Sequence, residues 1–295
     1  MNTSQDKMNK SLQSRILIVK EIITMLLFLI FMVPFAMVLL NSGKTSAEIM
    51  RSATSAPQNF FGQLADNVQR IFKIPTVDYV GAFFDSFIIT VVSLFVIVIF
   101  SAMAAWVITR NKTKWSTFLY MMFVSAMVIP FQVVMFPLVQ WFKMVGDAIR
   151  VPMLSSYQGI FFAYLGFGAP LSIFILSGFI KGVPLSLEEA ATIDGCSQPR
   201  IFFNIVTPLL TPVIVTVLIL NGIWIWNDYL LPLLLLGPSG KIQTLPLAVT
   251  AFVGAFVKQW DLILTSALLA MLPIIILFIF AQKYIIKGMV DGAVK

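Results

Sequence analysis

Six long apolar runs divide this chain, and they restrict its fold more than any other feature. The runs cover residues 22–40, 83–108, 115–142, 157–180, 209–236 and 262–281. A helix needs ~20 mostly apolar residues to cross the hydrocarbon core of a membrane, and each run is about that long or longer. Charged residues make up only 11% of the chain, whereas a soluble protein needs roughly 25%. The sequence therefore predicts an all-α, polytopic membrane protein with six transmembrane helices.

A polar, basic segment, residues 1–20, precedes the first apolar run. A basic start followed by an apolar run is also typical of a secretory signal peptide. The run at residues 22–40 is as long as a membrane span, however, and no small-residue cleavage pattern closes it. We therefore expect it to be the first transmembrane helix.

The charges between the runs predict the orientation in the membrane. The short basic turn at residues 110–114 is expected inside, because short loops rich in Lys and Arg stay in the cytosol. Both termini and residues 185–212 then lie in the cytosol as well, and residues 41–81 form an external loop with one short helix. The expected parts are a cytosolic segment, residues 1–20, a six-helix domain, residues 21–284, and a cytosolic tail, residues 285–295. The net charge of +7 suits membrane lipid with anionic headgroups.

The side chains available exclude several classes of function. The chain has no histidine and one cysteine, which excludes imidazole catalysis, a histidine-ligated metal and thiolate zinc or iron–sulfur sites. It contains no Walker A pattern, so we expect no ATP site in it. The basic residues are scattered rather than clustered on a helix, so nucleic acid is not an expected partner. The expectation is a protein that is not an enzyme and holds no metal.

Residues 185–212 are the longest segment among the later apolar runs that polar residues interrupt. Their pattern predicts a helix, a turn and a second helix. Ser186 and Glu189 have the spacing of a capping box at the start of the first helix. Gly195 provides the stop, because glycine readily takes the left-handed conformation at a helix end. Pro199 falls in the first turn of the second helix, where its missing N–H costs little. An ordered unit between two spans is expected to be a docking surface on the cytosolic side.

This interval resembles the EAA loop of the permease subunits of ATP-binding-cassette (ABC) transporters. The matching residues are Glu189, Ala190, Ala191, Asp194, Gly195, Ile205 and Pro208. Thr207 departs from the pattern, which usually has leucine before the proline. The resemblance implies that Glu189, Ala190, Ala191, Asp194 and Gly195 form the coupling helix that inserts into a groove of an ATP-binding subunit. A structural interpretation remains open, in which Glu189 only caps its helix and the two alanines only favour helix formation.

Further segments are similar to the carbohydrate-uptake branch of these permeases, which includes the smaller permease subunit of the maltose transporter. These segments are NDYLLP at 227–232, TLPLA at 244–248 and the C-terminal stretch at 282–295. Asp85, before Ser86, stands where that branch commonly has asparagine, and this departure leaves the local hydrogen bonding open. The resemblance implies an ABC importer type I permease fold and uptake of a mono- or oligosaccharide.

The same resemblance implies the partners and the location. They are two ATP-binding subunits that hold ATP and Mg²⁺, a second, homologous permease subunit and an extracytoplasmic sugar-binding protein, all at the bacterial cytoplasmic membrane. No cofactor is expected in this chain itself. Its role would be to convert movement at residues 189–195 into rearrangement of the fourth and fifth spans and so into alternating access.

Polar side chains in the fifth predicted span are candidates for the substrate pathway, because such groups at membrane depth normally face a cavity or another helix. Asn221, Trp224 and Asp228 recur at helical spacing, so an amide, an indole and a carboxylate share one face. They suit sugar hydroxyls and ring stacking. An interfacial aromatic belt with contacts to a neighbouring helix is the alternative. Gln132 in the third predicted span is a further candidate.

Three other functions remain as alternatives. One is an ABC permease for a solute that is not a sugar, such as an amino acid, phosphate or a polyamine. Another is an ion-coupled secondary carrier, which requires ionisable residues deep in the spans, where Asp228 gives little support. The third is a structural membrane scaffold, which leaves the ordered cytosolic interval without a purpose.

Overall fold

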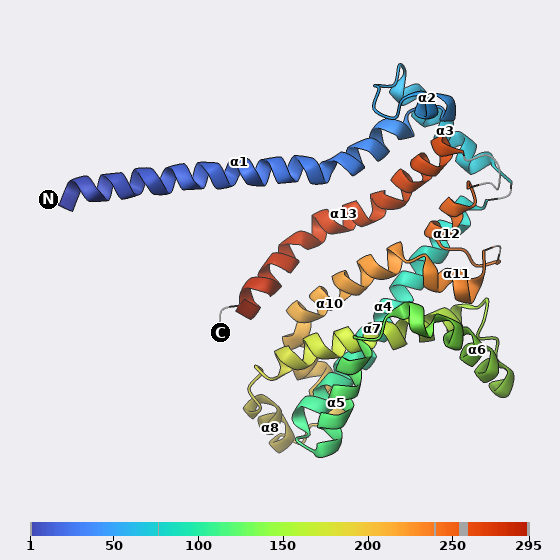
Figure 1. The fold of residues 1–295 in the computed structure, drawn as a ribbon. Helices are drawn as coiled ribbons and strands as arrows, with labels where there is room; N and C mark the ends of the chain where they lie inside the picture. The colour runs from blue at the N-terminus through green and yellow to red at the C-terminus, as the bar shows by residue number, and fades with distance from the viewer. Residues whose placement is uncertain (1, 76, 239, 254–258, 294–295) are drawn as a thin grey trace. The chain divides into compact units, whose positions relative to one another are not determined.

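The computed structural model describes residues 2–75, 77–238, 240–253 and 259–293, and within these ranges every regular element is a helix (Figure 1). The chain divides into two compact units. Unit 1 comprises residues 1–74 and 252–269, and unit 2 comprises residues 75–251 and 270–295. The predicted all-α fold class is confirmed.

Unit 1 combines one long apolar helix with short helices and the start of the last helix. Its elements are α1 (Asn2–Ser42), α2 (Ser46–Arg51), α3 (Phe60–Lys73) and the first residues of α13 (Trp260–Ala293). None of the most apolar part of α1 is buried, so this helix presents apolar side chains all round, as a lipid-facing span does. The segment at residues 41–81, for which the sequence predicts one short helix, contains both α2 and α3.

Unit 2 is a bundle centred on a pair of long helices. Its elements are α4 (Tyr79–Arg110), α5 (Lys114–Ala126), α6 (Phe131–Ile149), α7 (Tyr157–Ile180), α8 (Ser186–Ile193), α9 (Gln198–Ile201), the π-helical turn η1 (Phe202–Val206), α10 (Thr207–Asn227), α11 (Leu230–Leu236), α12 (Leu245–Thr250) and the remainder of α13. α4 and α7 form the most extensive helix pair, and α10 packs against both. The buried side of α4 includes Ala82, Ser86, Ser93 and Ala105. Such small residues let helix backbones approach closely.

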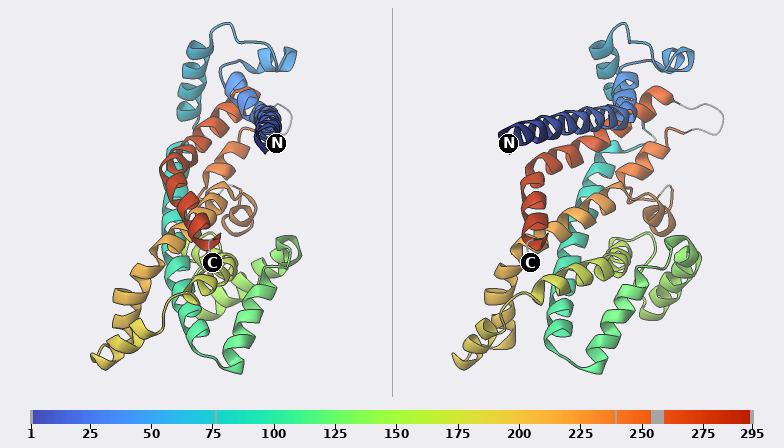
Figure 2. Two further views of the ribbon diagram at one scale, coloured as in Figure 1. Left: turned by 90° about the vertical axis from the view of Figure 1, so that its left-hand side faces the viewer. Right: turned by 60° about the vertical axis from the view of Figure 1, so that its left-hand side comes forward.

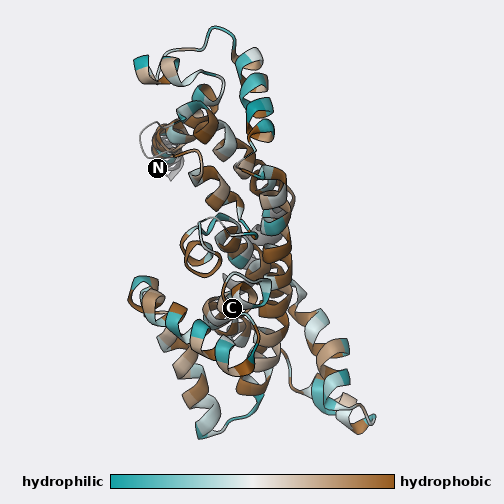
Figure 3. Ribbon diagram, turned by 90° about the vertical axis from the view of Figure 1, so that its right-hand side faces the viewer, coloured by the Kyte–Doolittle hydropathy of each residue, from teal (hydrophilic) through white to brown (hydrophobic). Residues whose placement is uncertain are grey.

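In the described part of the chain, five helical stretches are long and apolar enough to cross a membrane, or six if α5 and α6 together form one span. Figure 3 shows that the long helix α4 is hydrophobic over most of its length. The third predicted span, residues 115–142, is not straight, because α5 and α6 meet at 108° (Figure 2). The break lies just before Pro130, which has no N–H and disfavours a helical conformation at Ile129. Pro137, in contrast, lies inside α6.

The fifth predicted span, residues 209–236, ends earlier than expected. The helical stretch runs from Gln198 to Asn227. Asp228 then adopts an extended backbone (φ −73°, ψ 130°), and its Oδ1 accepts a hydrogen bond of 3.1 Å from the N–H of Leu230. A carboxylate that binds the backbone two residues ahead makes a turn. The apolar residues after it therefore form the separate helix α11 instead of extending the span.

A buried ammonium group organises the loop between α1 and α2. Lys44 is 1% exposed. Its Nζ donates to Asn41 Oδ1 at 2.9 Å and to the carbonyl oxygens of Ser52 and Ala53 at 3.1 and 3.2 Å. An ammonium has three protons, so these acceptors satisfy all of them. Polar bonds thus order a segment that has too few apolar residues for a core.

The short helix α2 begins with a complete capping box. Thr45 accepts from the N–H of Glu48, and the Glu48 carboxylate accepts from the N–H of Thr45 at 2.8 Å. The backbone hydrogen bond from Thr45 is the main reason that the pKa of Glu48 lies below its ordinary value. The ionised form that makes the cap is therefore favoured at neutral pH.

The carbonyl oxygen of Ser42, at the end of α1, joins three helices of unit 1. It accepts from Asn67 Nδ2 of α3 at 2.9 Å and from Thr265 Oγ1 of α13 at 3.0 Å. Both donors are fully buried. The last carbonyl oxygens of a helix lack partners within the helix, and here two other helices supply them.

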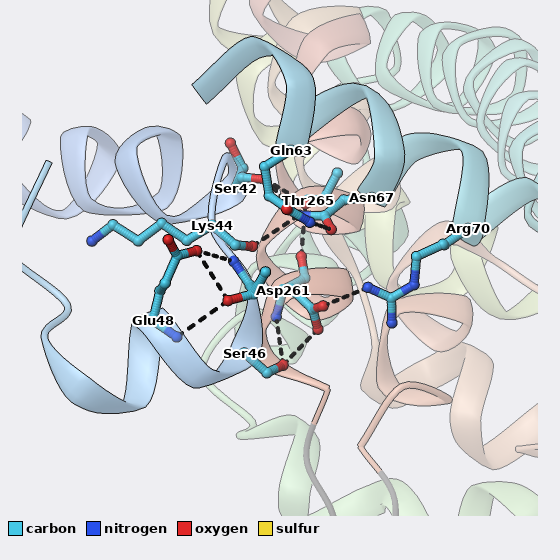
Figure 4. A network of polar contacts seen from close by, with 10 residues as sticks. Ser42, Lys44, Ser46, Glu48, Gln63, Asn67, Arg70, Asp261 and Thr265 are labelled. Atoms are coloured by element: carbon cyan, nitrogen blue, oxygen red, sulfur yellow. Dashed lines mark hydrogen bonds and ion pairs between the residues drawn. The ribbon is translucent and has the colours of Figure 1, made fainter. Parts of the chain in front are cut away.

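Asp261, in the first turn of α13, connects that helix to α2 and α3 (Figure 4). Its Oδ2 lies 2.7 Å from Arg70 Nη1, and its Oδ1 accepts from Ser46 Oγ at 2.6 Å. Asp261 is 4% exposed. The two short helices are thus attached to α13 through one buried carboxylate.

We expect Asp261→Ala to loosen α2 and α3, because it removes a charge-assisted hydrogen bond at each carboxylate oxygen. The free energy that holds α2 and α3 on α13 should fall by about 2 kcal/mol at most, because Arg70 is partly exposed. Hydrogen exchange at the α3 amides should rise accordingly. Asp66→Ala is the matched control, since Asp66 is an exposed carboxylate on α3. Equal exchange rates in the Asp261→Ala variant and the unchanged protein would contradict the assignment.

Candidate functional site

The first helix of the predicted helix–turn–helix unit is α8, but Ser186 does not cap it. The residue before it, Leu185, is already in the right-handed helical region (φ −64°, ψ −28°), and no side chain caps the helix. A serine caps from an extended position before the helix, whereas Ser186 is the first helical residue. The predicted capping box is therefore wrong, and the exposed side chain of Glu189 has no capping role.

The end of α8 is formed as the sequence predicts. Gly195 has φ +79°, in the left-handed region. Its N–H donates to the carbonyl oxygen of Thr192 at 3.0 Å, and the N–H of Cys196 donates to that of Ala191 at 2.9 Å. These two bonds make a Schellman motif, which glycine favours because it has no Cβ to clash. The predicted helix stop at Gly195 is confirmed.

The five residues of the predicted coupling helix separate into two groups by burial. Glu189, Ala190, Asp194 and Gly195 are exposed. Ala191 is 6% exposed and belongs to the core formed with α4, α7 and α10. Between them, Ile193 is 86% exposed, an unusual position for a large apolar side chain. One side of α8 thus packs on the rest of unit 2, and the opposite side is exposed.

Glu188 suits the positive end of the helix dipole by sequence, but its buried contacts with α4 were not predicted. It is 7% exposed, and Arg110 of α4 donates to its Oε1 from Nε at 2.9 Å, with Nη2 at 2.7 Å from the same oxygen. Trp106 Nε1 donates to its other oxygen, Oε2, at 2.9 Å. Arg110 also donates to the carbonyl oxygen of Val183, in the turn before α8, at 3.0 Å. The spacing of Trp106 and Arg110, four residues apart at the end of a span, was a usable signal.

The second helix of the unit starts at α9, where Pro199 lies in the first turn as predicted. It continues into the π-helical turn η1 before α10. Thr207 closes this turn, because its hydroxyl donates to the carbonyl oxygen of Phe202 at 2.9 Å and its N–H binds the same oxygen. Pro208 has no N–H to offer to the preceding turn. The residue that departs from the family pattern therefore has a structural role here.

Asn221, a predicted substrate residue, is a helix-packing residue in the structure. It is 3% exposed, and its Nδ2 donates to Ser172 Oγ of α7 at 3.1 Å and to the carbonyl oxygen of Val217 at 2.9 Å. A Cβ at Gly168 of α7 would lie 2.9 Å from Asn221 Oδ1. The close approach of α7 and α10 thus requires glycine at position 168, and the amide joins the two helices, in line with the helix-contact alternative.

Trp224 and Asp228 are brought together by Tyr164 of α7, which the sequence reasoning did not identify. The rings of Tyr164 and Trp224 meet edge to face with centroids 5.5 Å apart, and the Tyr164 hydroxyl donates to Asp228 Oδ2 at 3.2 Å. Trp224 is 39% exposed, so this cluster has an accessible indole. Gln132 is exposed in the first turn of α6, and within the described residues its side chain has no hydrogen bond to this cluster.

The Asp85–Ser86 pair of α4 holds the segment before α12. Asp85 accepts from the Tyr157 hydroxyl at 2.5 Å and from the N–H of Gln243 at 2.9 Å, and Ser86 Oγ accepts from the N–H of Leu245 at 2.7 Å. The oxygen atoms of a carboxylate and of a hydroxyl can each accept such hydrogen bonds. Asp85, the second departure from the family pattern, therefore joins α4 to α7 and to the segment before α12, and Ser86 joins α4 to α12 itself.

Comparison with known proteins identifies the family. Residues 97–291 match the profile of the family described as "Binding-protein-dependent transport system inner membrane component". Over 269 residues the chain is 41% identical to the "Probable starch degradation products transport system permease protein AmyC" of Thermoanaerobacterium thermosulfurigenes, covering 91% of this chain and 93% of that protein. It is 38% identical to the "Melibiose/raffinose/stachyose import permease protein MelC" of Bacillus subtilis, covering 73% of this chain and 76% of that protein.

The fold has a counterpart among solved structures. A crystal structure of a bacterial ABC transporter that imports the polysaccharide alginate contains a chain that aligns with a TM-score of 0.73 and 19% identity, covering 92% of this chain and 97% of that one. This likeness identifies the type I permease fold of ABC importers. With its apolar helices and these relatives, the chain is a multi-pass protein of the bacterial cytoplasmic membrane and belongs to the family of inner membrane components of binding-protein-dependent transport systems.

Proposed function

We propose that this chain is one permease subunit of an ABC importer that takes up a sugar, as a mono- or oligosaccharide. The similarity to AmyC, which extends over 91% of the chain, carries the proposal, because that protein is named for transport of starch degradation products. The aromatic rings of Tyr164 and Trp224 with the Asp228 carboxylate give further support, since apolar faces with a few polar groups are typical of small-molecule sites.

The coupling role of α8 is part of this proposal. Its exposed side carries Glu189, Ala190, Asp194 and Gly195, and the small residues there allow another protein to approach closely. Ile193, with its large exposed apolar side chain, offers that protein an anchor. Ala191 supports the surface from within, because it packs on the core of unit 2. The surface would fit a groove of an ATP-binding subunit.

The remaining partners follow from this assignment. Two ATP-binding subunits would hold ATP and Mg²⁺, and a second, homologous permease subunit would complete the pathway. A sugar-binding protein would deliver the substrate from outside. We place both chain termini and α8 on the cytosolic side and residues 41–81 outside, on the strength of the basic turn at residues 110–114.

Reconstitution of the transporter tests the proposed function. The chain would be purified with the ATP-binding subunit, second permease and binding protein encoded beside it, and placed in proteoliposomes. Uptake of labelled maltotriose, raffinose, glutamine, phosphate and spermidine would then be compared. ATP-dependent uptake of a saccharide alone is the expected result. Uptake of one of the other solutes would contradict the sugar assignment, and ATP-independent uptake driven by an ion gradient would contradict the importer class.

We expect Glu189→Lys and Gly195→Val to uncouple transport from ATP hydrolysis. The first reverses a charge on the exposed side of α8, and the second places a branched residue at φ +79°, where the strain is about 1–2 kcal/mol. Sugar uptake per ATP hydrolysed should fall on the order of tenfold. Ser186→Ala is the control, because its hydroxyl makes no cap. Normal coupling ratios in both variants would rule out α8 as the coupling helix.

Substitutions in α10 should distinguish a substrate residue from a packing residue. Trp224→Ala should raise the KM for the transported saccharide about tenfold, or ~1.4 kcal/mol, with the amount of folded complex unchanged. Asn221→Ala should instead lower the thermal stability, by about 1 kcal/mol, because it removes a hydrogen bond between helices. Uptake kinetics and thermal unfolding measure the two effects. An unchanged KM in Trp224→Ala would remove this residue from the substrate pathway.

A further inference from the structure

At its cytosolic end, α4 holds α8 through the buried carboxylate of Glu188, which accepts hydrogen bonds at both of its oxygens. The Arg110–Glu188 pair has side-chain exposures of 18% and 9%, and the second carboxylate oxygen is bonded to Trp106. Both views of Figure 2 show α8 at the end of unit 2 where α4 ends. Because Arg110 and Trp106 are one helical turn apart, they grip the carboxylate from a single face of α4. Both of its oxygens are engaged and shielded from water.

The same end of α4 also holds the turn that leads into α8. Arg110 Nη2 donates to the carbonyl oxygen of Val183, which is 9% exposed. The guanidinium thus binds α8 and the preceding turn at once, and its planar fork keeps those bonds in one geometry. The contacts toward the fifth span are of another kind, since α10 packs on α4 in the apolar core and the Trp106 ring packs against Phe202 of η1, with centroids 5.4 Å apart.

We propose that Glu188, Arg110 and Trp106 are positioning residues that pass the displacement of α8 directly into α4. This inference rests on the proposed coupling role of α8. In it, α4, the turn at residues 181–185 and α8 move as one body, so the second span follows the ATP-binding subunit first. Motion reaches the fifth span through the apolar packing of α10 on α4 and through the Trp106–Phe202 contact with the π-helical turn. The route therefore differs from a direct transfer to the fourth and fifth spans alone.

A transport experiment gives the first test. Glu188→Gln and Arg110→Met should each lower the number of saccharide molecules imported per ATP about tenfold, because a charge-assisted bond is lost. The binding protein would be loaded with an equimolar mixture of maltotriose and raffinose. Co-purification with the ATP-binding subunit should be unchanged, and the reversed pair Glu188→Arg with Arg110→Glu should recover part of the coupling. Lys112→Met is the matched control, since it removes an exposed positive charge two residues from Arg110.

A distance measurement gives a second test that needs no sugar. Spin labels would be placed at Asn111→Cys and Ser186→Cys, two exposed positions, in a Cys196→Ser background, in the complete transporter. The distance between labels should be narrow and equal in the nucleotide-free and the ATP–vanadate states, and Glu188→Gln should broaden it when nucleotide binds. The proposal would be overturned if the distance between the labels changed with nucleotide in the protein that keeps Glu188 and Arg110. A Glu188→Gln variant with normal coupling would also overturn it. If Glu189→Lys still uncouples in that case, the proposed function stands without this route.

Discussion

The exclusion of water from the hydrocarbon core is the constraint on which this structure depends. Backbone N–H and C=O groups there must bind each other, so each apolar run becomes a helix. Hydrophobicity does not draw these helices together, because lipid is equally apolar, and close packing takes over that task. The small residues on α4 and Gly168 on α7 serve this purpose, since they bring α4, α7 and α10 near enough for Asn221 to reach Ser172.

Three carboxylates make their contacts where helices begin or end, and there they decide the local geometry. Asp261 attaches α2 and α3 to α13, Asp228 ends the fifth span, and Glu188 ties α8 to α4. Each is a carboxylate with two or more donors. Asp261 and Glu188 are buried, and a buried charge is costly without such partners, so these two sites tolerate few alternative arrangements. Rigid connections at the ends of apolar helices are what a protein needs if force applied at one short helix is to move a whole span.

Periodicity predicted the fourth span, which agrees with α7, and the helix stop at Gly195, because both depend on local preferences of the chain. The capping box failed, although the residue types and spacing were right. Whether Ser186 caps α8 depends on the conformation of Leu185, which the turn after α7 sets. The end of the fifth span at Asp228 was likewise hidden inside a continuous apolar run, whereas Pro130 marks the bend of the third run in the sequence itself. Asn221, Trp224 and Asp228 have helical spacing, yet Asn221 faces Ser172 and the other two meet at Tyr164.

The sequence by itself determined the membrane class, the helical fold and the helix stop at Gly195, because apolar length and glycine preference act over a few neighbouring residues. The tertiary structure alone decided which of two adjacent glutamates is buried. Glu188 binds Arg110 from a helix 78 positions earlier in the chain, whereas Glu189 points outward. The burial of Glu188 and the exposure of Glu189 follow from the packing of α4 against α7 and from the direction of the turn before α8. Those relations arise from packing between distant segments, which no local pattern contains.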